Sequence, residues 1–393
     1  MNVEGNSKIG VVGAGAMGSG IAQIAAAHGH EVILYDTSQP AIERAYSAIE
    51  SSLARSVGKK RITDADSRAA RDRVKSAEGS LDAFAGCALV IEAVVEDLAV
   101  KRGLFASLEN AVGDDAILAT NTSSLSVTSI ASVCRKPERF LGIHFFNPPV
   151  VMPLVEIIPG IATDASRLAE AQGIIESWGK TAVIASDTPG FIVNRIARPF
   201  YGEAIRIYEE GIADMATIDW AMREIGRFKM GPFELMDFIG NDINLAATKS
   251  VYEATFHDSR FRPTLTQQKL VDAGFLGRKT GRGYYDYRDG AAKPIATENR
   301  ELGDLVFRRI LSMLINQAAD ALYLRIASAH DIDRAMTLGV NYPKGLLAWA
   351  DEIGIAETVK WLAALQEFYG EERYRPSPLL KTMAEDGFTF FNT

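Results

Sequence analysis

The sequence predicts an α/β protein in which a parallel-sheet domain comes first and an all-α region follows in two tandem copies. Within residues 8–36, a strand, a glycine turn, a helix and a second strand follow one another. Apolar runs of strand length then alternate with helical patterns as far as Ile184, which is typical of βαβ units. Beyond Gly190 the patterns are helical, and the C-terminal part of the chain resembles the helical part before it.

Residues 8–36 have the pattern of a dinucleotide cradle. In such a turn the first glycine permits a sharp bend, the second lets the backbone approach a pyrophosphate, and the third lets the helix pack on the strand. The helix N-terminus adds free N–H groups and a partial positive charge for the phosphates. The alternative is that the glycines serve packing alone. The residues predicted here to bind the cofactor are Gly13, Gly15, Ala16, Met17 and Gly18.

Asp36 ends the second strand of this unit, at residues 32–35. Its carboxylate would accept hydrogen bonds from the ribose hydroxyls, and it would repel the 2′-phosphate of NADP. The sequence therefore predicts a Rossmann-type NAD-binding domain, which we place at residues 1–186, with NAD as the cofactor.

Composition excludes several classes of function. A length of 393 residues predicts two or three domains, and the net charge of −8 argues against nucleic acid or an anionic membrane as partner. The two cysteines, Cys87 and Cys134, predict no disulfide framework, and no metal-ligand cluster of Cys and His is visible. Residues 1–7 lack the layout of a signal peptide, and no apolar run is long enough to span a bilayer. We therefore expect a cytoplasmic protein without a metal.

Two predicted strands end in polar residues. Residues 87–95 read as a buried strand that ends near Glu96, and Lys101 lies in the helix that follows. Because ligands bind at the carboxyl ends of parallel strands, both side chains are expected beside the cofactor rather than in a core. A solvated strand end is the alternative for Glu96. The next strand, residues 116–120, opens into NTSSL, where one of Ser123 and Ser124 is expected to cap the helix at 126–133 and the other to meet a ligand.

His144 ends a further predicted strand, and Glu156 lies on the next apolar run. Adjacent strands would bring the two side chains together. A carboxylate that accepts one ring N–H fixes the tautomer and leaves the other nitrogen to act as a base. Oxidation of an alcohol by NAD releases a proton, so the reaction requires such a base.

A basic loop, GKKRI at residues 58–62, follows a helix that contains Ser52. From spacing alone, a solvated loop is favoured over an anchor for an anionic substrate.

Seven motifs follow one another in unbroken order: the cradle, EAVVEDLAVKRGLF (92–105), NTSSL (121–125), HFFNPPVVMPLVEII (144–158), DTPGFIVNR (187–195), MGPFELMDFIG (230–240) and GRKTGRGYYDY (277–287). Together they identify the chain as resembling the L-3-hydroxyacyl-CoA dehydrogenases over about residues 7–290. The resemblance implies that His144 is the catalytic base and Glu156 its partner. It also implies that Ser123 contacts both the substrate and the nicotinamide region of the cofactor, and that Asn194 helps to hold the reacting substrate. It implies cofactor contacts for Glu96, Lys101 and Lys279, and it assigns Ser52 and Lys59 to the CoA moiety, which reverses the reading of the basic loop. Pro153 stands where some members carry Lys.

The helical region is repeated without a gap. Asp219 and Asp333 share an offset with several other pairs (333 − 219 = 114). We therefore predict two helical copies, at 187–290 and 295–393, joined by a linker near 288–294. Arg308 falls opposite Asn194, so the second copy is expected to be non-catalytic. Single-copy members of the family commonly dimerise through this domain, so the chain is expected to be a homodimer or a monomeric internal pseudo-dimer.

The resulting prediction is the reversible, NAD-dependent oxidation of L-3-hydroxyacyl-CoA to 3-oxoacyl-CoA, with a short-chain substrate such as 3-hydroxybutyryl-CoA. Three alternatives stay open. They are a 3-hydroxyadipyl-CoA dehydrogenase of aromatic-acid degradation, a dehydrogenase for a free hydroxy acid, and a crystallin-like NAD-binding structural protein.

Overall fold

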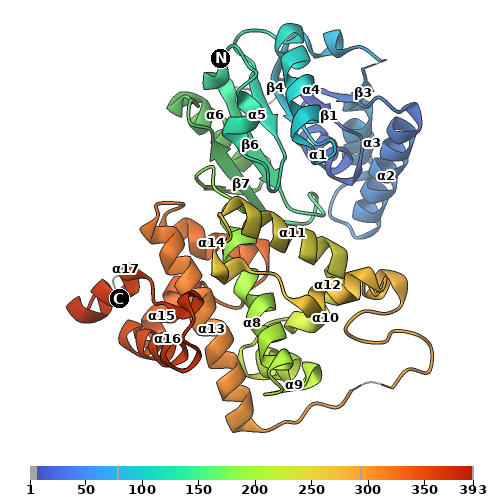
Figure 1. The fold of residues 1–393 in the computed structure, drawn as a ribbon. Helices are drawn as coiled ribbons and strands as arrows, with labels where there is room; N and C mark the ends of the chain where they lie inside the picture. Colours follow the sequence, from blue (N-terminus) through green and yellow to red (C-terminus); the bar gives the residue numbers. More distant parts are fainter. Residues whose placement is uncertain (1–6, 78, 293, 392–393) are drawn as a thin grey trace. The chain divides into compact units, whose positions relative to one another are not determined.

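The computed structural model describes residues 7–77, 79–292 and 294–391. It divides the chain into two compact units, Met1–Thr188 and Pro189–Thr393 (Figure 1). No helix in the described part of the chain is long and apolar enough to cross a membrane.

The first unit is built on an eight-stranded sheet with the order β3-β2-β1-β4-β5-β6-β7-β8. All neighbours pair in parallel except β6 and β7, which are antiparallel. The strand order reverses between β1 and β4, where open α/β sheets bind their ligands. The strands are β1 (Lys8–Val12), β2 (Val32–Tyr35), β3 (Val74–Ser76), β4 (Cys87–Glu92), β5 (Ile117–Thr120), β6 (Phe140–Phe145), β7 (Leu154–Pro159) and β8 (Thr181–Ile184).

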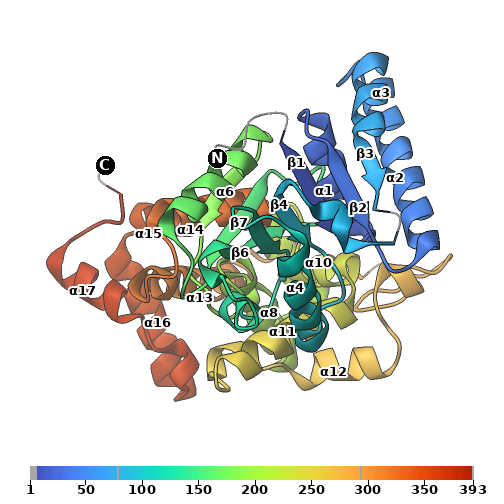
Figure 2. The same cartoon turned by 90° about the horizontal axis from the view of Figure 1, so that it is seen from above.

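Six α-helices accompany this sheet. Figure 2 shows α2 and α3 side by side at the β3 edge. Apolar side chains of α1 and α2 pack with the central strands in one buried core. The helices are α1 (Ala16–Ala27), α2 (Gln39–Gly58), α3 (Asp64–Arg73), α4 (Leu98–Ala111), α5 (Val127–Ala131) and α6 (Ala165–Ser177).

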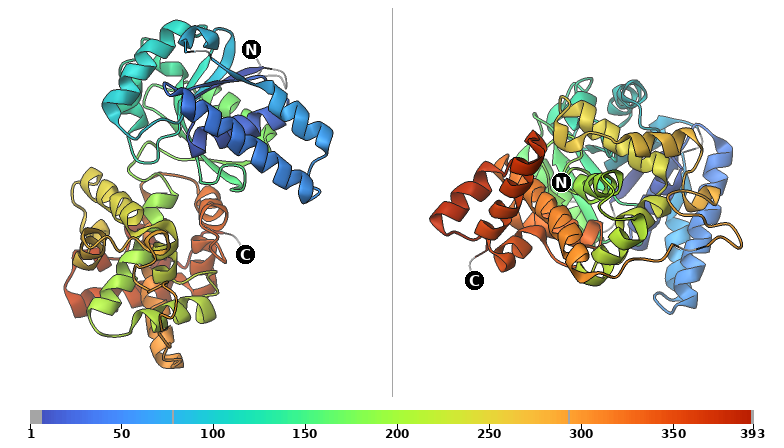
Figure 3. Two further views of the ribbon diagram at one scale, coloured as in Figure 1. Left: turned by 90° about the vertical axis from the view of Figure 1, so that its right-hand side faces the viewer. Right: turned by 60° about the horizontal axis from the view of Figure 1, so that its bottom comes forward.

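The second unit is all-helical, and its elements recur in the same order. The helices of the first part are α7 (Val193–Ile196), α8 (Arg198–Glu209), α9 (Met215–Trp220), α10 (Pro232–Ile239), α11 (Asn241–Ala254) and α12 (Leu265–Asp272). Those of the second part are α13 (Arg300–Tyr323), α14 (Ala329–Gly339), α15 (Leu346–Ile353), α16 (Ile355–Tyr369) and α17 (Pro378–Asp386). Helix α13, orange in Figure 3, packs along α8 and against α15, α16 and α17.

Matching hydrogen bonds show that the repetition extends to side chains. Asp219 accepts the backbone N–H groups of Phe233 (2.9 Å) and Glu234 (3.0 Å) at the start of α10. Asp333 accepts those of the residues that start α15, Leu347 and Ala348, both at 2.9 Å. Both helix N-termini are therefore capped by an aspartate at the same offset, as expected for a duplicated unit.

The sequence pattern predicts one helix over residues 191–211 and another over residues 215–224, and the structure contradicts both predictions. Residues 191–211 do not form one helix but divide into α7 and α8, because Pro199 has no N–H to donate to the preceding turn. The counterpart of Pro199 is Met313, and α13 accordingly runs unbroken over 24 residues. The expected helix at 215–224 is α9 followed by a π-helical turn, Ala221–Ile225. The non-helical linker extends beyond Pro294, since α13 begins only at Arg300.

Candidate active site

The glycine turn between β1 and α1 has the geometry of a phosphate cradle. Gly13 has a φ of +103°, and a Cβ there would lie 2.5 Å from the Ala93 carbonyl oxygen. A Cβ on Gly18 would lie 1.8 Å from the Gly13 carbonyl oxygen, so only glycine permits this strand–helix contact. A Cβ on Gly15 would meet nothing within 4 Å, which leaves its backbone open to a ligand. Helix α1 has no side-chain cap, so Ala16 and Met17 lie where N–H groups remain for phosphate oxygens.

Asp36 anchors this turn through its carboxylate. Its Oδ2 accepts the N–H of Ala14 at 2.8 Å, and its Oδ1 accepts that of Ser38 at 2.9 Å. A carboxylate oxygen has a second lone pair, so the side chain can still accept bonds from two ribose hydroxyls. The residues present therefore fit NAD.

The β4–α4 connection contains a buried ion-pair network. Lys101, on α4, places its Nζ 2.6 Å from Glu92 Oε1 and 3.3 Å from Glu96 Oε2. Glu92 is fully buried, and it also accepts the Thr120 hydroxyl at 2.7 Å. Lys101 has only 1% of its surface exposed, so the expectation that it lies outside a core was wrong.

Glu96 holds the loop that follows β5. Its Oε1 accepts the Thr122 hydroxyl at 2.6 Å and the backbone N–H groups of Ser123 (2.9 Å) and Ser124 (3.1 Å). Burial alone would raise the pKa of Glu96, but Lys101 and the donors of this loop outweigh burial and lower the pKa. The side chain is thus a charged anchor and not merely a solvated strand end.

The expected capping role of Ser123 or Ser124 was wrong. Both hydroxyls donate to Glu96, and the N-cap of α5 is Ser126, whose hydroxyl accepts the N–H of Ser129 at 3.1 Å. Asp187 also accepts the N–H groups of Val127 and Thr128, which fixes the start of α5. These carboxylates are distant in sequence, so no local pattern indicated either anchor.

His144 and Glu156 face each other across the only antiparallel strand pair of the described sheet. They are direct register partners on β6 and β7, and His144 Nδ1 lies 2.7 Å from Glu156 Oε2. Glu156 is fully buried, His144 is 6% exposed, and the Phe146 ring lies 4.6 Å from the imidazole. The predicted pairing is confirmed, and the carboxylate can hold Nδ1 in its protonated form.

Asn121 links the β5 loop to the strand that carries His144. Its Oδ1 accepts the N–H of Phe145 at 2.8 Å, and its own N–H donates to the Glu92 carbonyl oxygen. Asn121, Thr122 and Glu92 were not among the predicted site residues. Their position at strand ends β4 and β5 was the one available indication, because parallel strands present their carboxyl ends at the same edge.

The other predicted residues lie on or at the end of α2, or in the second unit. Ser52 is half-buried near the end of α2, and Lys59 is the exposed residue at its C-cap. Asn194 lies on α7 in the helical unit. Lys279, also in the helical unit, forms an ion pair with Asp242, with Nζ–Oδ distances of 2.6 and 2.7 Å.

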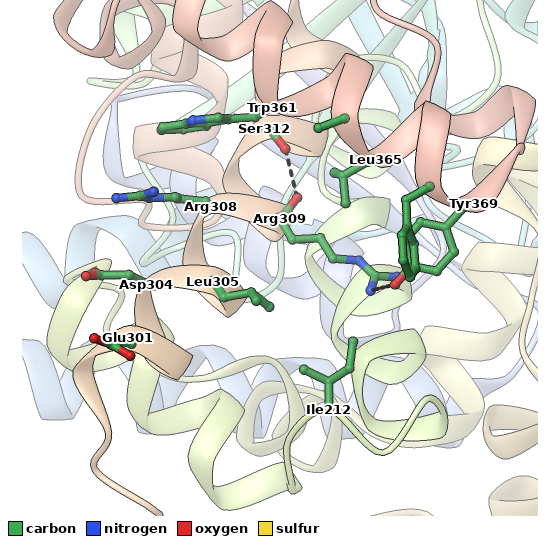
Figure 4. Close-up of a pocket in the computed structure, with 12 residues that line it drawn as sticks. Ile212, Glu301, Asp304, Leu305, Arg308, Arg309, Ser312, Trp361, Leu365 and Tyr369 are labelled. Carbon is green, nitrogen blue, oxygen red and sulfur yellow. Dashed lines mark hydrogen bonds between the residues drawn. The ribbon is translucent and has the colours of Figure 1, made fainter.

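An apolar groove of about 610 Å³ lies between α13 and α16 of the second helical copy, and Ile212 of the first copy also lines it (Figure 4). Arg308, the counterpart of Asn194, lies on its wall with its guanidinium 5.5 Å from the Trp361 ring. Among the described residues that line the groove there is no histidine. The counterpart of Asn194 is therefore a cation beside an aromatic ring instead of an amide. The main apolar lining residues are Ile212, Leu305, Trp361, Leu365 and Phe368.

The glycine cradle, Asp36 and the buried His144–Glu156 pair at the ligand-binding edge define an NAD-dependent oxidoreductase. Comparison with family models agrees. Residues 8–188 match the NAD-binding domain of 3-hydroxyacyl-CoA dehydrogenase, and the model of its C-terminal domain matches twice, at 190–287 and 305–389. The chain belongs to the 3-hydroxyacyl-CoA dehydrogenase family, and its reaction is the NAD-dependent oxidation of a 3-hydroxyacyl-CoA.

Several relatives are similar over most of their length. The 3-hydroxyadipyl-CoA dehydrogenase of Escherichia coli K12 is 38% identical and covers 97% of this chain and 98% of its own. The 3-hydroxybutyryl-CoA dehydrogenase of Bradyrhizobium diazoefficiens is 44% identical over 74% of this chain and 98% of its own. A crystal structure of 3-hydroxybutyryl-CoA dehydrogenase from E. coli K12 has a TM-score of 0.91 at 37% identity, and the match covers 97% of this chain and 98% of that one.

Proposed function

We propose that His144 is the general base of this reaction and that Glu156 orients it. With Nδ1 held by Glu156 at 2.7 Å, Nε2 is the nitrogen that would take the proton of the substrate hydroxyl. NAD, when bound, accepts the hydride from the carbon that carries this hydroxyl. The single observation that carries the assignment is this buried pair at the end of β6, at the same sheet edge as the Glu96 loop.

The remaining predicted residues have supporting roles in the proposal. Ser123 and Asn194 hold the reacting part of the substrate, and Ser52 and Lys59 hold the CoA portion. Asp36 and the glycine turn hold the adenosine half of NAD, while Glu96, Lys101 and Lys279 serve its other half. The exposed cation of Lys59 at the C-cap of α2 suits an anionic phosphate, which supports a CoA thioester over a free acid.

The substrate proposed is a short-chain L-3-hydroxyacyl-CoA such as 3-hydroxybutyryl-CoA, which is supported by the name of the 44%-identical relative. The test is NADH formation with purified enzyme, using 3-hydroxybutyryl-CoA, its D enantiomer and free 3-hydroxybutyrate. Activity with the L thioester alone is expected. Faster turnover of the free acid than of the thioester would overturn the CoA assignment.

A second candidate substrate is 3-hydroxyadipyl-CoA. The observation that favours it is the E. coli relative of that name, which covers 97% of this chain and hence both helical copies. A kcat/KM at least about tenfold higher for 3-hydroxyadipyl-CoA than for 3-hydroxybutyryl-CoA would establish it as the preferred substrate.

The tandem copies at 187–290 and 295–393 are proposed to form a monomeric internal pseudo-dimer, in which the second copy is non-catalytic. Support comes from the packing of α13 along α8 and from the equivalent caps at Asp219 and Asp333. Light scattering should give the mass of one chain. A chain ending at Gly290 should aggregate or dimerise, because apolar faces are exposed. A stable dimer of the full-length chain would favour the homodimer instead.

A cytoplasmic location is also proposed. The two cysteines support it, since both are buried and neither is in a disulfide. Fractionation of the native host with antibody detection would test the location.

A further inference from the structure

Lys101 is enclosed between two carboxylates and is almost completely buried. Its Nζ lies 2.6 Å from Glu92 and 3.3 Å from Glu96, and only 1% of its surface is exposed. A buried ammonium is costly unless its donors are satisfied, and here two carboxylates satisfy it. Such a side chain acts through its neighbours.

Glu92 fixes the other end of this network in the core of the sheet. Its Oε1 accepts the N–H of Val94 at 2.7 Å as well as Lys101, and its Oε2 accepts the Thr120 hydroxyl at 2.7 Å. These partners lie at or just beyond the ends of β4 and β5, which pair in parallel with Glu92 opposite Thr120. Glu92 is therefore held by rigid strands, while Glu96 is partly exposed and lies beyond the strand end.

Glu96 in turn holds two backbone amides and three hydroxyls of residues 122–124 on one oxygen. The contacts therefore run from strand β4 in the core, through Glu92, Lys101 and Glu96 in turn, to the loop at residues 122–124. Without Lys101, the carboxylates of Glu92 and Glu96 would face each other uncompensated, and Glu96 would be displaced from the loop.

We propose that Glu92 and Lys101 are positioning residues that set the conformation of the Thr122–Ser124 loop through Glu96, and thereby the affinity for NAD. This inference rests on the proposed function, because it takes this loop as part of the cofactor site. It adds Glu92 to the residues that support the cofactor site, and it gives Lys101 a positioning role beyond the cofactor contact that the family resemblance implies.

The first experiment measures the local stability of the loop in the absence of cofactor. Glu92→Gln retains the shape of the side chain and an acceptor for Thr120, but it removes the charge that holds Lys101. Hydrogen exchange of the Ser123 and Ser124 amides should become faster in this variant, while exchange in β1 and β2 should not change. Unchanged exchange at both serines would overturn the proposal.

The second experiment measures NADH affinity by fluorescence titration. Glu92→Gln and Lys101→Met should each weaken binding by about tenfold, the effect of losing one charge-assisted hydrogen bond. The double variant should recover thermal stability relative to Lys101→Met, because it removes the uncompensated charge, but it should not recover NADH affinity. Full recovery of affinity, or faster loop exchange with unchanged affinity, would overturn the proposed link to the cofactor.

Glu109→Gln is the matched control. Glu109 lies on the same helix, is similarly buried, and accepts the N–H groups of Arg135 and Lys136 at 2.7 and 2.9 Å. The Glu109→Gln variant should have a lower free energy of unfolding, but its NADH affinity and the hydrogen exchange at Ser123 and Ser124 should not change. An equal effect in this control would show that the network is merely structural and would overturn the proposal. If the wild-type enzyme binds no NADH, the functional assignment fails, whereas the exchange measurement still reads the network.

Discussion

His144 Nδ1 lies 2.7 Å from Glu156 Oε2, and the two residues are opposite partners in the antiparallel pair β6–β7. Directly opposite side chains of such a pair lie on the same face of the sheet. The orientation of the imidazole is therefore set by strand register, which a change of side chain leaves intact.

Replacement of His144 by Gln should lower kcat by about 10²–10⁴-fold, because the variant has no group that can take a proton near neutral pH. NADH affinity should change little, since the cradle lies on β1 and α1. Steady-state kinetics and NADH titration of the same preparation provide the test. Equal losses of cofactor binding and turnover would contradict the role of base. Glu156→Gln, which keeps an acceptor for Nδ1, should have a smaller effect on kcat.

Asp36→Ala should weaken the binding of NAD. It should also reduce the preference of the enzyme for NAD over NADP, because the carboxylate that would repel a 2′-phosphate is removed. The substitution also removes the acceptor for the N–H groups of Ala14 and Ser38. Asp36→Asn is the control that keeps one acceptor oxygen without the charge. The measurement is kcat/KM for both cofactors, and an unchanged NAD/NADP ratio in both variants would exclude Asp36 as the selective residue.

Arg309→Met should destabilise the helical unit by about 3–5 kcal/mol, as expected when one partner of a buried ion pair is removed. Arg309 Nε lies 3.1 Å from Glu203, and its other nitrogens donate to Glu210, Tyr369 and Tyr374. The neighbouring Arg308 is exposed, so Arg308→Met should change the free energy of unfolding by less than about 0.5 kcal/mol. Urea denaturation of both variants measures this difference in the free energy of unfolding. Similar losses in the two variants would contradict the explanation by the buried ion pair.

The same cluster predicts a pH dependence. Burial alone would raise the pKa of Glu210, but hydrogen bonds from Arg309 and Tyr369 outweigh burial and lower the pKa. A carboxyl whose pKa is lower in the folded state stabilises the fold above its unfolded pKa of about 4.5, and this contribution is lost as the pH falls. Glu210→Gln should therefore lose less stability than the wild type between about pH 6 and pH 3. If the variant lost as much stability at low pH as the wild type, this prediction would be contradicted.

Local patterns in the sequence were sufficient for the glycine cradle and for the offset between Asp219 and Asp333. Each depends on residues close in the chain or on direct repetition, so no knowledge of packing is required. The helix break at Pro199 also has a local cause in the sequence, because proline has no backbone N–H to donate.

Apart from the predicted His144–Glu156 pair, the tertiary structure alone decided which polar side chains meet. The Glu96 anchor of Ser123 and Ser124, the capping of α5 by Asp187, and the Arg309–Glu203 pair all join residues far apart in sequence. Spacing carries no information on such pairs, because their partners are fixed by strand order and helix packing. By itself, the sequence determined the fold class, the cofactor cradle and the candidate base. The burial of Lys101 and the anchoring of the loop at residues 122–124 depend on the packed sheet, because a charged side chain that is removed from water requires a partner of opposite charge.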